Sequence, residues 1–340
     1  MCSEKTLEVF GTSVRLGEKL HKQIQVGELA NGSPVYIPLM VLRGRRPGPV
    51  LWLCGAAHGD ELNGIFAMRE VYLNANTEEI QGALVFTPIL NSMAFVERRK
   101  VSFLDLLDME SQFPGKAEGL ITERMAFQIF RQMKKVANAV INFHTMGPIN
   151  HSFPYTVSKI VSEADPEVIE KAFQMALAFG VKANCRVDLR TTKDELPGRI
   201  SGSLDATCLQ NGIPAIMPEV GAGGRWEKVN VSTAERGIYN VMRFLGILEG
   251  EPDRAPDQIV IPRRKWLRTN RGGVAQVLFQ PGDIVPKGTV YARILNMWDT
   301  LEELRAEEDM YLIGVISNPV VSSGDRIGFG GFGWHAPEET

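Results

Sequence analysis

Apolar residues along this chain predict buried strands that alternate with amphipathic helices. Continuous apolar runs of about four to eight residues are typical of strands that are buried on both faces of a sheet. Such runs occupy Val50–Cys54, Ala83–Leu90, Ala139–Phe143 and Pro214–Met217. Apolar residues at helical spacing predict helices over Glu61–Asn74, Thr122–Val136, Pro166–Phe179 and Ser232–Leu248. Strands that alternate with helices predict an α/β fold with a largely parallel sheet.

The two ends of the chain have a different pattern. Residues 6–42 contain β-branched residues interrupted by glycine and asparagine, which predicts short strands and turns. Residues 265–333 again predict short strands and no strong helix, and the proline-containing segment 251–257 before them is typical of a linker. We therefore expect an α/β domain over residues 1–250, with a β-rich lead-in over residues 1–46. Residues 251–340 are expected to form the linker and a small, barrel-like all-β domain.

Composition narrows the class of protein. The chain has 340 residues, more than the ~100–200 residues of a typical domain. Its residues are 44% hydrophobic and 23% charged, which favours a folded, soluble protein over a disordered one. The net charge of −3 argues against nucleic acid as a partner. No apolar run approaches the ~20 residues that span a bilayer, so a membrane is not an expected partner.

Cysteine usage predicts a reducing compartment. Cys2, Cys54, Cys185 and Cys208 are widely spaced, and none forms a C-x-x-C pair. This distribution argues against a disulfide scaffold, a zinc ribbon and a redox motif. Residues 1–15 also lack the apolar core of a signal peptide. We therefore expect a cytoplasmic protein.

Polar residues follow the ends of the four predicted strands. His58 and Glu61 come after the first strand, Asn91 after the second, His144 after the third and Glu219 after the fourth. The carboxyl ends of parallel strands meet along one edge of a sheet, so we expect these side chains to converge. Two histidines and a glutamate are a frequent ligand set of catalytic zinc, which leaves a position for water. His58, Glu61 and His144 are therefore the predicted ligands, and Glu219 is the candidate base that activates the water.

Other histidines fit this site less well. His151 is an alternative third ligand, but it precedes a polar loop and does not end a predicted strand, so His144 is favoured. His21 and His335 are expected at the surface.

Four segments resemble the succinylglutamate desuccinylase/aspartoacylase family of zinc carboxypeptidase-like hydrolases. The segment Gly55–Gly64 (GAAHGDELNG) resembles the zinc-binding segment of that family, and Phe143–Thr145 resembles its third-ligand segment. Gly212–Gly221 resembles the strand that carries its catalytic glutamate, and Phe113–Gly115 resembles the Phe-Pro-Gly that follows its substrate clamp. The order and spacing agree over residues 48–248. The C-terminal β unit also resembles the barrel appended in bacterial deacylases of this group.

The resemblance implies a fold and a reaction. The fold is a zinc carboxypeptidase-like mixed sheet of eight strands with helices on both faces. The reaction is hydrolysis of a small N-acylated amine or amino acid, with one Zn²⁺ per chain held by His58, Glu61 and His144. Glu219 would take a proton from the attacking water and pass it to the leaving amine.

Two departures from the family pattern concern the substrate. Where the family has Asp-Leu-Asn-Arg, this chain has Asp-Met-Glu-Ser, so Glu110 and Ser111 replace the asparagine and arginine of the clamp. A serine lacks the fork of donors with which arginine binds a carboxylate, and a glutamate repels one. The clamp therefore favours a cationic or neutral acylated amine over a free α-carboxylate. The family has an aspartate two residues before the third ligand, and this chain has Asn142 there. As a neutral hydrogen-bond acceptor, Asn142 can still orient a metal-binding imidazole ring.

Several further residues are candidates for substrate binding. The full set is Asn91, Arg98, Arg99, Lys100, Glu110, Ser111 and Arg225. Arg199 is a weaker candidate.

Alternative functions remain open at this point. A metallocarboxypeptidase requires a clamp for a peptide C-terminus, which the Glu110–Ser111 exchange disfavours. A non-catalytic binding protein on the same scaffold fits the altered clamp but leaves the intact ligands and base unexplained. The C-terminal unit resembles a biotinyl/lipoyl-type barrel, yet residues 299–310 contain no lysine to carry a cofactor. A homo-oligomer contact through Trp298 and Tyr311 is therefore expected, with packing on the first domain as the alternative.

Overall fold

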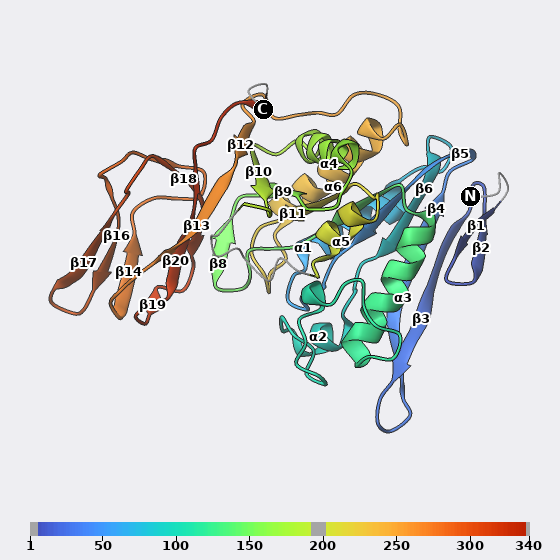
Figure 1. Ribbon diagram of the computed structural model, residues 1–340, viewed down its shortest axis with the longest axis horizontal. Helices are drawn as coiled ribbons and strands as arrows, with labels where there is room; N and C mark the ends of the chain where they lie inside the picture. The colour runs from blue at the N-terminus through green and yellow to red at the C-terminus, as the bar shows by residue number, and fades with distance from the viewer. Residues whose placement is uncertain (1–5, 192–201, 338–340) are drawn as a thin grey trace.

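The computed structural model describes residues 6–191 and 202–337. Its centre is a nine-stranded sheet in the order β12-β10-β9-β11-β7-β5-β6-β4-β3 (Figure 1). The strands are β3 (Lys19–Glu28), β4 (Pro34–Arg43), β5 (Arg46–Cys54), β6 (Gln81–Thr87), β7 (Ala139–Asn142), β9 (Tyr155–Ile160), β10 (Ala183–Asp188), β11 (Ala215–Glu219) and β12 (Ile259–Ile261). The pairs β11–β7, β7–β5, β5–β6, β9–β10 and β10–β12 are parallel, and the others are antiparallel. The predicted mixed sheet is therefore confirmed.

Helices cover both faces of this sheet, as predicted. They are α1 (Asn63–Asn74), α2 (Ser92–Glu97), α3 (Ile121–Val136), α4 (Pro166–Ala178), α5 (Leu204–Gln210) and α6 (Lys228–Phe244), with a short 3-10 helix η1 (Met109–Ser111). The side chains of β5 alternate between the faces: Leu51 and Leu53 join a core with α1, α4 and α6, whereas Trp52 joins a core with α3 and α5. Trp52 is fully buried, and its indole N–H donates to Thr87 Oγ1 at 2.9 Å. This two-sided burial explains the continuous apolar run of the sequence.

Several elements differ from the prediction, among them α6 and β12. Helix α6 begins at Lys228, four residues before the predicted start, and the backbone N–H of the preceding Glu227 donates to Asn63 Oδ1 at 3.0 Å. The ninth strand, β12, comes from the region expected to hold only a linker and the C-terminal β domain, and it pairs with β10. The sheet therefore has nine strands where the resemblance implied eight. A three-residue strand is too short to show in a hydrophobic pattern.

The C-terminal region forms the predicted all-β unit from two sheets. The strands are β13 (Arg263–Arg268), β14 (Gly273–Val277), β15 (Ile284–Val285), β16 (Val290–Leu295), β17 (Thr300–Arg305), β18 (Met310–Ile316), β19 (Val320–Val321) and β20 (Arg326–Phe332). One sheet has the order β13-β20-β18-β15, and β8 (Asn150–Ser152) pairs with β18. The other has the order β17-β16-β14-β19. Because β8 precedes the unit by more than a hundred residues, this pairing fastens the unit to the α/β part of the chain.

A shared core strengthens this attachment. Tyr155 and Cys185 of the nine-stranded sheet pack with Trp266, Tyr311 and Phe329 of the C-terminal unit. Packing on the first domain, the alternative raised for this unit, is therefore observed. Tyr311 is only 5% exposed, so of the two residues expected at an oligomer contact only Trp298, which is 80% exposed, remains accessible.

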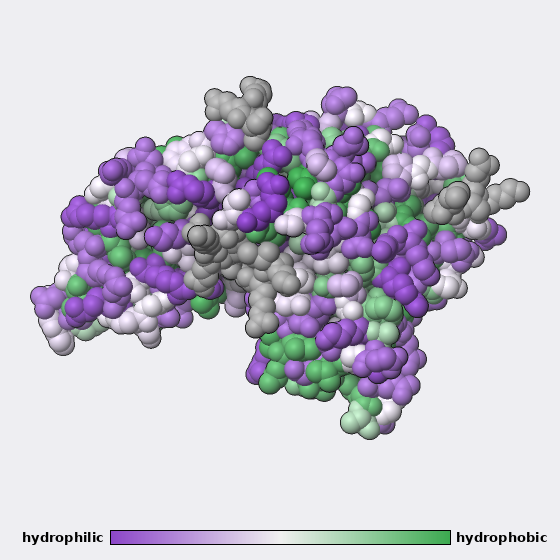
Figure 2. All heavy atoms as spheres, in the orientation of Figure 1, coloured by the Kyte–Doolittle hydropathy of each residue, from purple (hydrophilic) through white to green (hydrophobic). Residues whose placement is uncertain are grey.

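The visible surface is mostly polar. Figure 2 shows one apolar patch on the lower part of this face, where Figure 1 places α2 and the segment that follows it. Exposed apolar side chains of that region are Val96, Phe103, Leu104 and Leu106. Across the described ranges, every helix is too short or too polar to cross a membrane.

A short N-terminal hairpin, β1 (Thr6–Val9) with β2 (Thr12–Arg15), completes the fold.

Candidate metal centre and its pocket

Three strand ends bring the predicted site together. The chain leaves β5 at Cys54 and reaches His58 and Glu61 before α1 begins. It leaves β7 at Asn142 and reaches His144, whose backbone N–H donates to Pro218 O of β11 at 2.9 Å. Glu219, the last residue of β11, forms a parallel bridge with His144. The shared edge of the parallel strands therefore gathers these four residues, as predicted.

The loop after β5 depends on a glycine. A Cβ atom on Gly59 would lie 2.1 Å from the backbone carbonyl carbon of Ala94 in α2. The N–H of Gly59 also donates to Arg99 O at 2.8 Å. Only a glycine allows this close approach, which holds the loop carrying His58 against α2.

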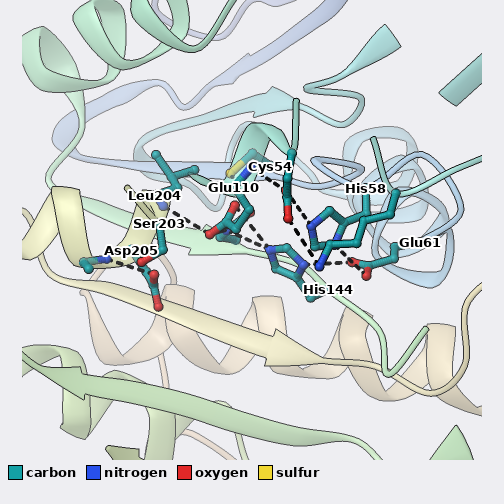
Figure 3. A network of polar contacts seen from close by, with 12 residues as sticks. Cys54, His58, Glu61, Glu110, His144, Ser203, Leu204 and Asp205 are labelled. Carbon is teal, nitrogen blue, oxygen red and sulfur yellow. Dashed lines mark hydrogen bonds and ion pairs between the residues drawn. The ribbon is translucent and has the colours of Figure 1, made fainter. Parts of the chain in front are cut away.

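The carboxylate of Glu61 lies between two imidazole rings (Figure 3). His58 Nδ1 is 2.8 Å from Glu61 Oε1, and His144 Nδ1 is 2.8 Å from Glu61 Oε2. The three residues are buried, and one ligand atom from each lies within 4.8 Å of the others. Two imidazole nitrogens and one carboxylate oxygen are ligands that suit a zinc ion.

The opposite charges of this cluster shift the pKa values of its members. Burial acts to raise the pKa of Glu61, but the adjacent His58 and His144 lower it to about 2. Burial acts to lower the pKa of His58, but Glu61 and Asp108 together raise it to about 9. In the metal-free chain the cluster therefore holds an ionised glutamate next to a protonated histidine, and a metal ion would take the place of that proton.

Glu219 stands apart from these contacts. It is 8% exposed, and its Oε2 has no hydrogen-bond partner among the described residues. Burial raises its pKa to about 7. A buried oxygen without a partner costs free energy, and such orphaned groups are typical of functional sites. Glu219 therefore has the availability and the basicity of a proton acceptor near neutral pH.

Carboxylates also lie behind both histidines. Asp108 Oδ1 is 3.0 Å from His58 Nε2, and Glu110 Oε2 is 3.5 Å from His144 Nε2. Although burial opposes it, the hydrogen bond with His58 and the charge of Lys100 hold the pKa of Asp108 well below its usual range. Asp108 was not among the residues predicted from the sequence, although it opens the altered clamp segment.

A pocket of about 320 Å³ opens over the cluster. Of the predicted residues, His58, Glu61, His144, Glu219, Lys100 and Glu110 line it. Asn91 is fully buried instead and caps α2, with its Oδ1 accepting from Ala94 N at 3.0 Å. Arg98, Arg99, Ser111 and Arg225 are not among the residues that line the pocket. Arg199 lies outside the described residues.

The pocket also contains residues that were not predicted from the sequence. They are Asp60, Asp108, Lys159, Trp266 and Arg326, among others. Lys159 lies on β9, is 8% exposed, and donates to Asp205 Oδ1 at 2.7 Å and to Ser203 Oγ at 3.1 Å. Trp266 and Arg326 belong to the C-terminal unit, and the Arg326 guanidinium lies 4.5 Å from the Trp266 ring centroid. No local sequence signal marks these residues, because only the packing of distant segments brings them to the pocket.

Comparison with known proteins gives consistent matches. A sequence model of the succinylglutamate desuccinylase/aspartoacylase catalytic domain matches residues 47–245. N-alpha-acetyl-L-2,4-diaminobutyric acid deacetylase of Halomonas elongata is 28% identical over 300 residues, which cover 86% of this chain and 84% of that protein.

Solved structures agree in fold. A succinylglutamate desuccinylase from Silicibacter sp. TM1040 superposes with a TM-score of 0.81, 23% identity and coverage of 97% of this chain and 99% of that one. The product-bound ectoine utilization protein of Ruegeria pomeroyi superposes with a TM-score of 0.80, 24% identity and coverage of 92% and 94%. Both comparisons include the C-terminal β unit, so the two-part architecture recurs in those proteins.

Proposed function

Since the chain belongs to the succinylglutamate desuccinylase/aspartoacylase family of deacylases, we propose that it hydrolyses the amide bond of a small N-acylated amine or amino acid with one zinc ion. The observation that carries the proposal is the buried group His58, Glu61 and His144, with the unpartnered Glu219 Oε2 in the same pocket. A protein that only binds its ligand does not require a buried carboxylate, such as Glu219, with an oxygen that has no hydrogen-bond partner among the described residues.

The donor set fits zinc. The two Nδ1 atoms face one carboxylate, so three ligands of the types that zinc prefers surround one point. Zinc bound there would supply an activated water and polarise the acyl carbonyl. His58 and His144 would be held in position by the carboxylates behind them, as is common for metal-binding histidines.

Glu219 supplies the proton transfers in this proposal. Its ionised Oε2 accepts a proton from the attacking water and then donates that proton to the leaving nitrogen. A carboxyl group with a pKa of about 7 can do both near neutral pH.

The pocket lining suggests the substrate class. It places acidic side chains (Asp60 and Asp108) and basic side chains (Lys100, Lys159 and Arg326) around one small cavity. The Halomonas relative is named for an acetylated diamino acid, which carries both a free amine and a carboxylate. We propose N-acetylated diamino acids as the first substrate class to test. Their free amine agrees with the cationic substrate expected from the altered clamp, and the basic side chains of the pocket, in place of that clamp, would bind their carboxylate.

A direct test is the hydrolysis of N-alpha-acetyl-L-2,4-diaminobutyrate, measured by the acetate that is released. We expect turnover that stops after removal of metal by a chelator and returns on addition of zinc. The acetylated compound without its side-chain amine is the matched control for charge. Turnover that persists in the metal-free chain would refute the zinc mechanism.

We also propose a cytoplasmic location. Cys54, Cys185 and Cys208 are buried and free, as expected in a reducing compartment. Fractionation of the native host would test this location.

A further inference from the structure

We propose that Glu110 is the carboxylate that positions His144 for metal binding. This inference rests on the proposed metal site and names a residue that maintains it. Glu110 stands in the altered clamp segment, where a substrate contact was expected from the sequence. The structure instead places its carboxylate behind the metal-binding ring (Figure 3).

The His144 ring needs an acceptor on its far side. Its Nδ1 faces Glu61, so Nδ1 is the atom that would bind the ion. The ring proton is then on Nε2, and a metal-binding imidazole usually donates this proton to a carboxylate or carbonyl. Two side chains approach Nε2: Asn142 through its Nδ2 at 3.0 Å, and Glu110 through its Oε2 at 3.5 Å.

The sequence predicted Asn142 as an acceptor for this ring, but the structure presents its Nδ2, a donor, to His144 Nε2 at 3.0 Å. Its Nδ2 also donates to both oxygens of Glu110, at 3.2 Å each, and its Oδ1 accepts from Cys54 Sγ at 3.6 Å. Exchanging the amide N and O atoms would place the amide oxygen 3.2 Å from both carboxylate oxygens, where no proton lies between them. The hydrogen-bond network therefore fixes the amide orientation. The amide donor at 3.0 Å fits the metal-free ring, in which Nδ1 carries a proton towards Glu61 and Nε2 accepts. Once a metal takes Nδ1 and the proton is on Nε2, two donors would face each other, and Glu110 Oε2, at 3.5 Å, is the acceptor to which Nε2 can turn.

Glu110 is itself held in place. It is 6% exposed, and its Oε1 accepts from the backbone N–H of Leu204 at 3.1 Å. A buried carboxylate requires such donors, because the ionised form is costly without them. With Asn142, Leu204 and His144 around it, its oxygens are used within the protein. We therefore assign Glu110 a positioning role.

One short turn supports both histidines. Asp108, two residues earlier, contacts His58 Nε2 at 3.0 Å, and its Oδ1 also accepts from Glu110 N at 3.1 Å. The turn from Asp108, which caps η1, to Glu110 within η1 therefore places one carboxylate beside each metal-binding ring. The position of one carboxylate is tied to the other by that backbone hydrogen bond.

The test is the zinc affinity of the full chain, measured by competition with a chromophoric chelator. Glu110→Gln keeps the size of the side chain but removes its charge, and we expect a ~10–100-fold weaker Kd for zinc. Glu118→Gln removes the charge of a side chain that is 95% exposed in the same region, and it should leave the Kd unchanged. The double variant Glu110→Asn with Asn142→Asp moves the carboxylate to the other neighbour of His144, and it should restore most of the affinity.

The outcomes separate the two proposals. If the parent chain binds no zinc, the proposed function fails. If the parent binds zinc and Glu110→Gln binds it equally well, the positioning role alone is overturned. If the single variant is weak and the double variant stays equally weak, Glu110 acts through packing and the positioning role is also overturned. Thermal unfolding of the metal-free variants identifies any loss of folding.

Discussion

Replacing Glu219 with glutamine should have opposite effects on turnover and on stability. The substitution removes the proposed base, and general bases contribute typically ~10²–10⁴-fold to rate. It keeps the three predicted metal ligands, so the zinc content should not change. It also removes a carboxylate that is buried with an unpartnered oxygen, so the metal-free fold should become more stable at high pH.

The size of the stability effect follows from the pKa. Burial raises the pKa of Glu219 from 4.5 to about 7, and each pH unit between the two values corresponds to about 1.4 kcal/mol. Below pH 4.5 the group is protonated in both states and contributes nothing. As the pH rises from 4.5 to 7, the unfolded chain ionises first, and the parent protein loses up to about 3 kcal/mol of unfolding free energy. The variant lacks this loss.

The assay is urea unfolding of the metal-free parent and variant between pH 4.5 and pH 8. The difference in unfolding free energy should grow from near zero to about 3 kcal/mol in favour of the variant, less any cost of burying the new amide. Glu118→Gln, at an exposed position, should show no such growth. A difference that is the same at pH 4.5 and pH 8 would refute the reasoning about burial.

Three further predictions follow from the same contacts. His58→Ala should lose both zinc and turnover, measured by elemental analysis and by the acetate assay. Zinc binding should weaken as the pH falls below about 9, because the metal must displace the proton of His58. Burial acts to lower the pKa of His58, but Glu61 and Asp108 raise it to about 9. A Kd for zinc that does not depend on pH would contradict this prediction. Lys159→Met should destabilise the fold by about 3–5 kcal/mol in denaturant unfolding, because Asp205 is left buried without its partner. Pairing it with Asp205→Asn should recover much of that loss.

The centre of the site could be predicted from the sequence because its signals are local. Each ligand follows a buried apolar strand, and parallel strands must end at one edge of their sheet. The apolar runs that precede His144 and Glu219 therefore suffice to place these two residues at neighbouring strand ends.

Other parts of the site depend on contacts between distant segments. Lys159 lies within a strand, and its ion pair with Asp205 forms only when α5 packs against β11 and β7 of the same sheet. Trp266 reaches the pocket because the C-terminal unit docks through β8. Glu110 is unusual for the family, but its contact with His144 depends on the path of η1, which hydrophobic periodicity does not encode.

The central claim is that His58, Glu61 and His144 bind one catalytic zinc ion. The most direct test is the metal content of the purified chain after exhaustive desalting, with His58→Ala measured in parallel. We predict about one zinc per parent chain and none in the variant. A parent chain that contains no metal and takes up none when zinc is added would contradict the claim.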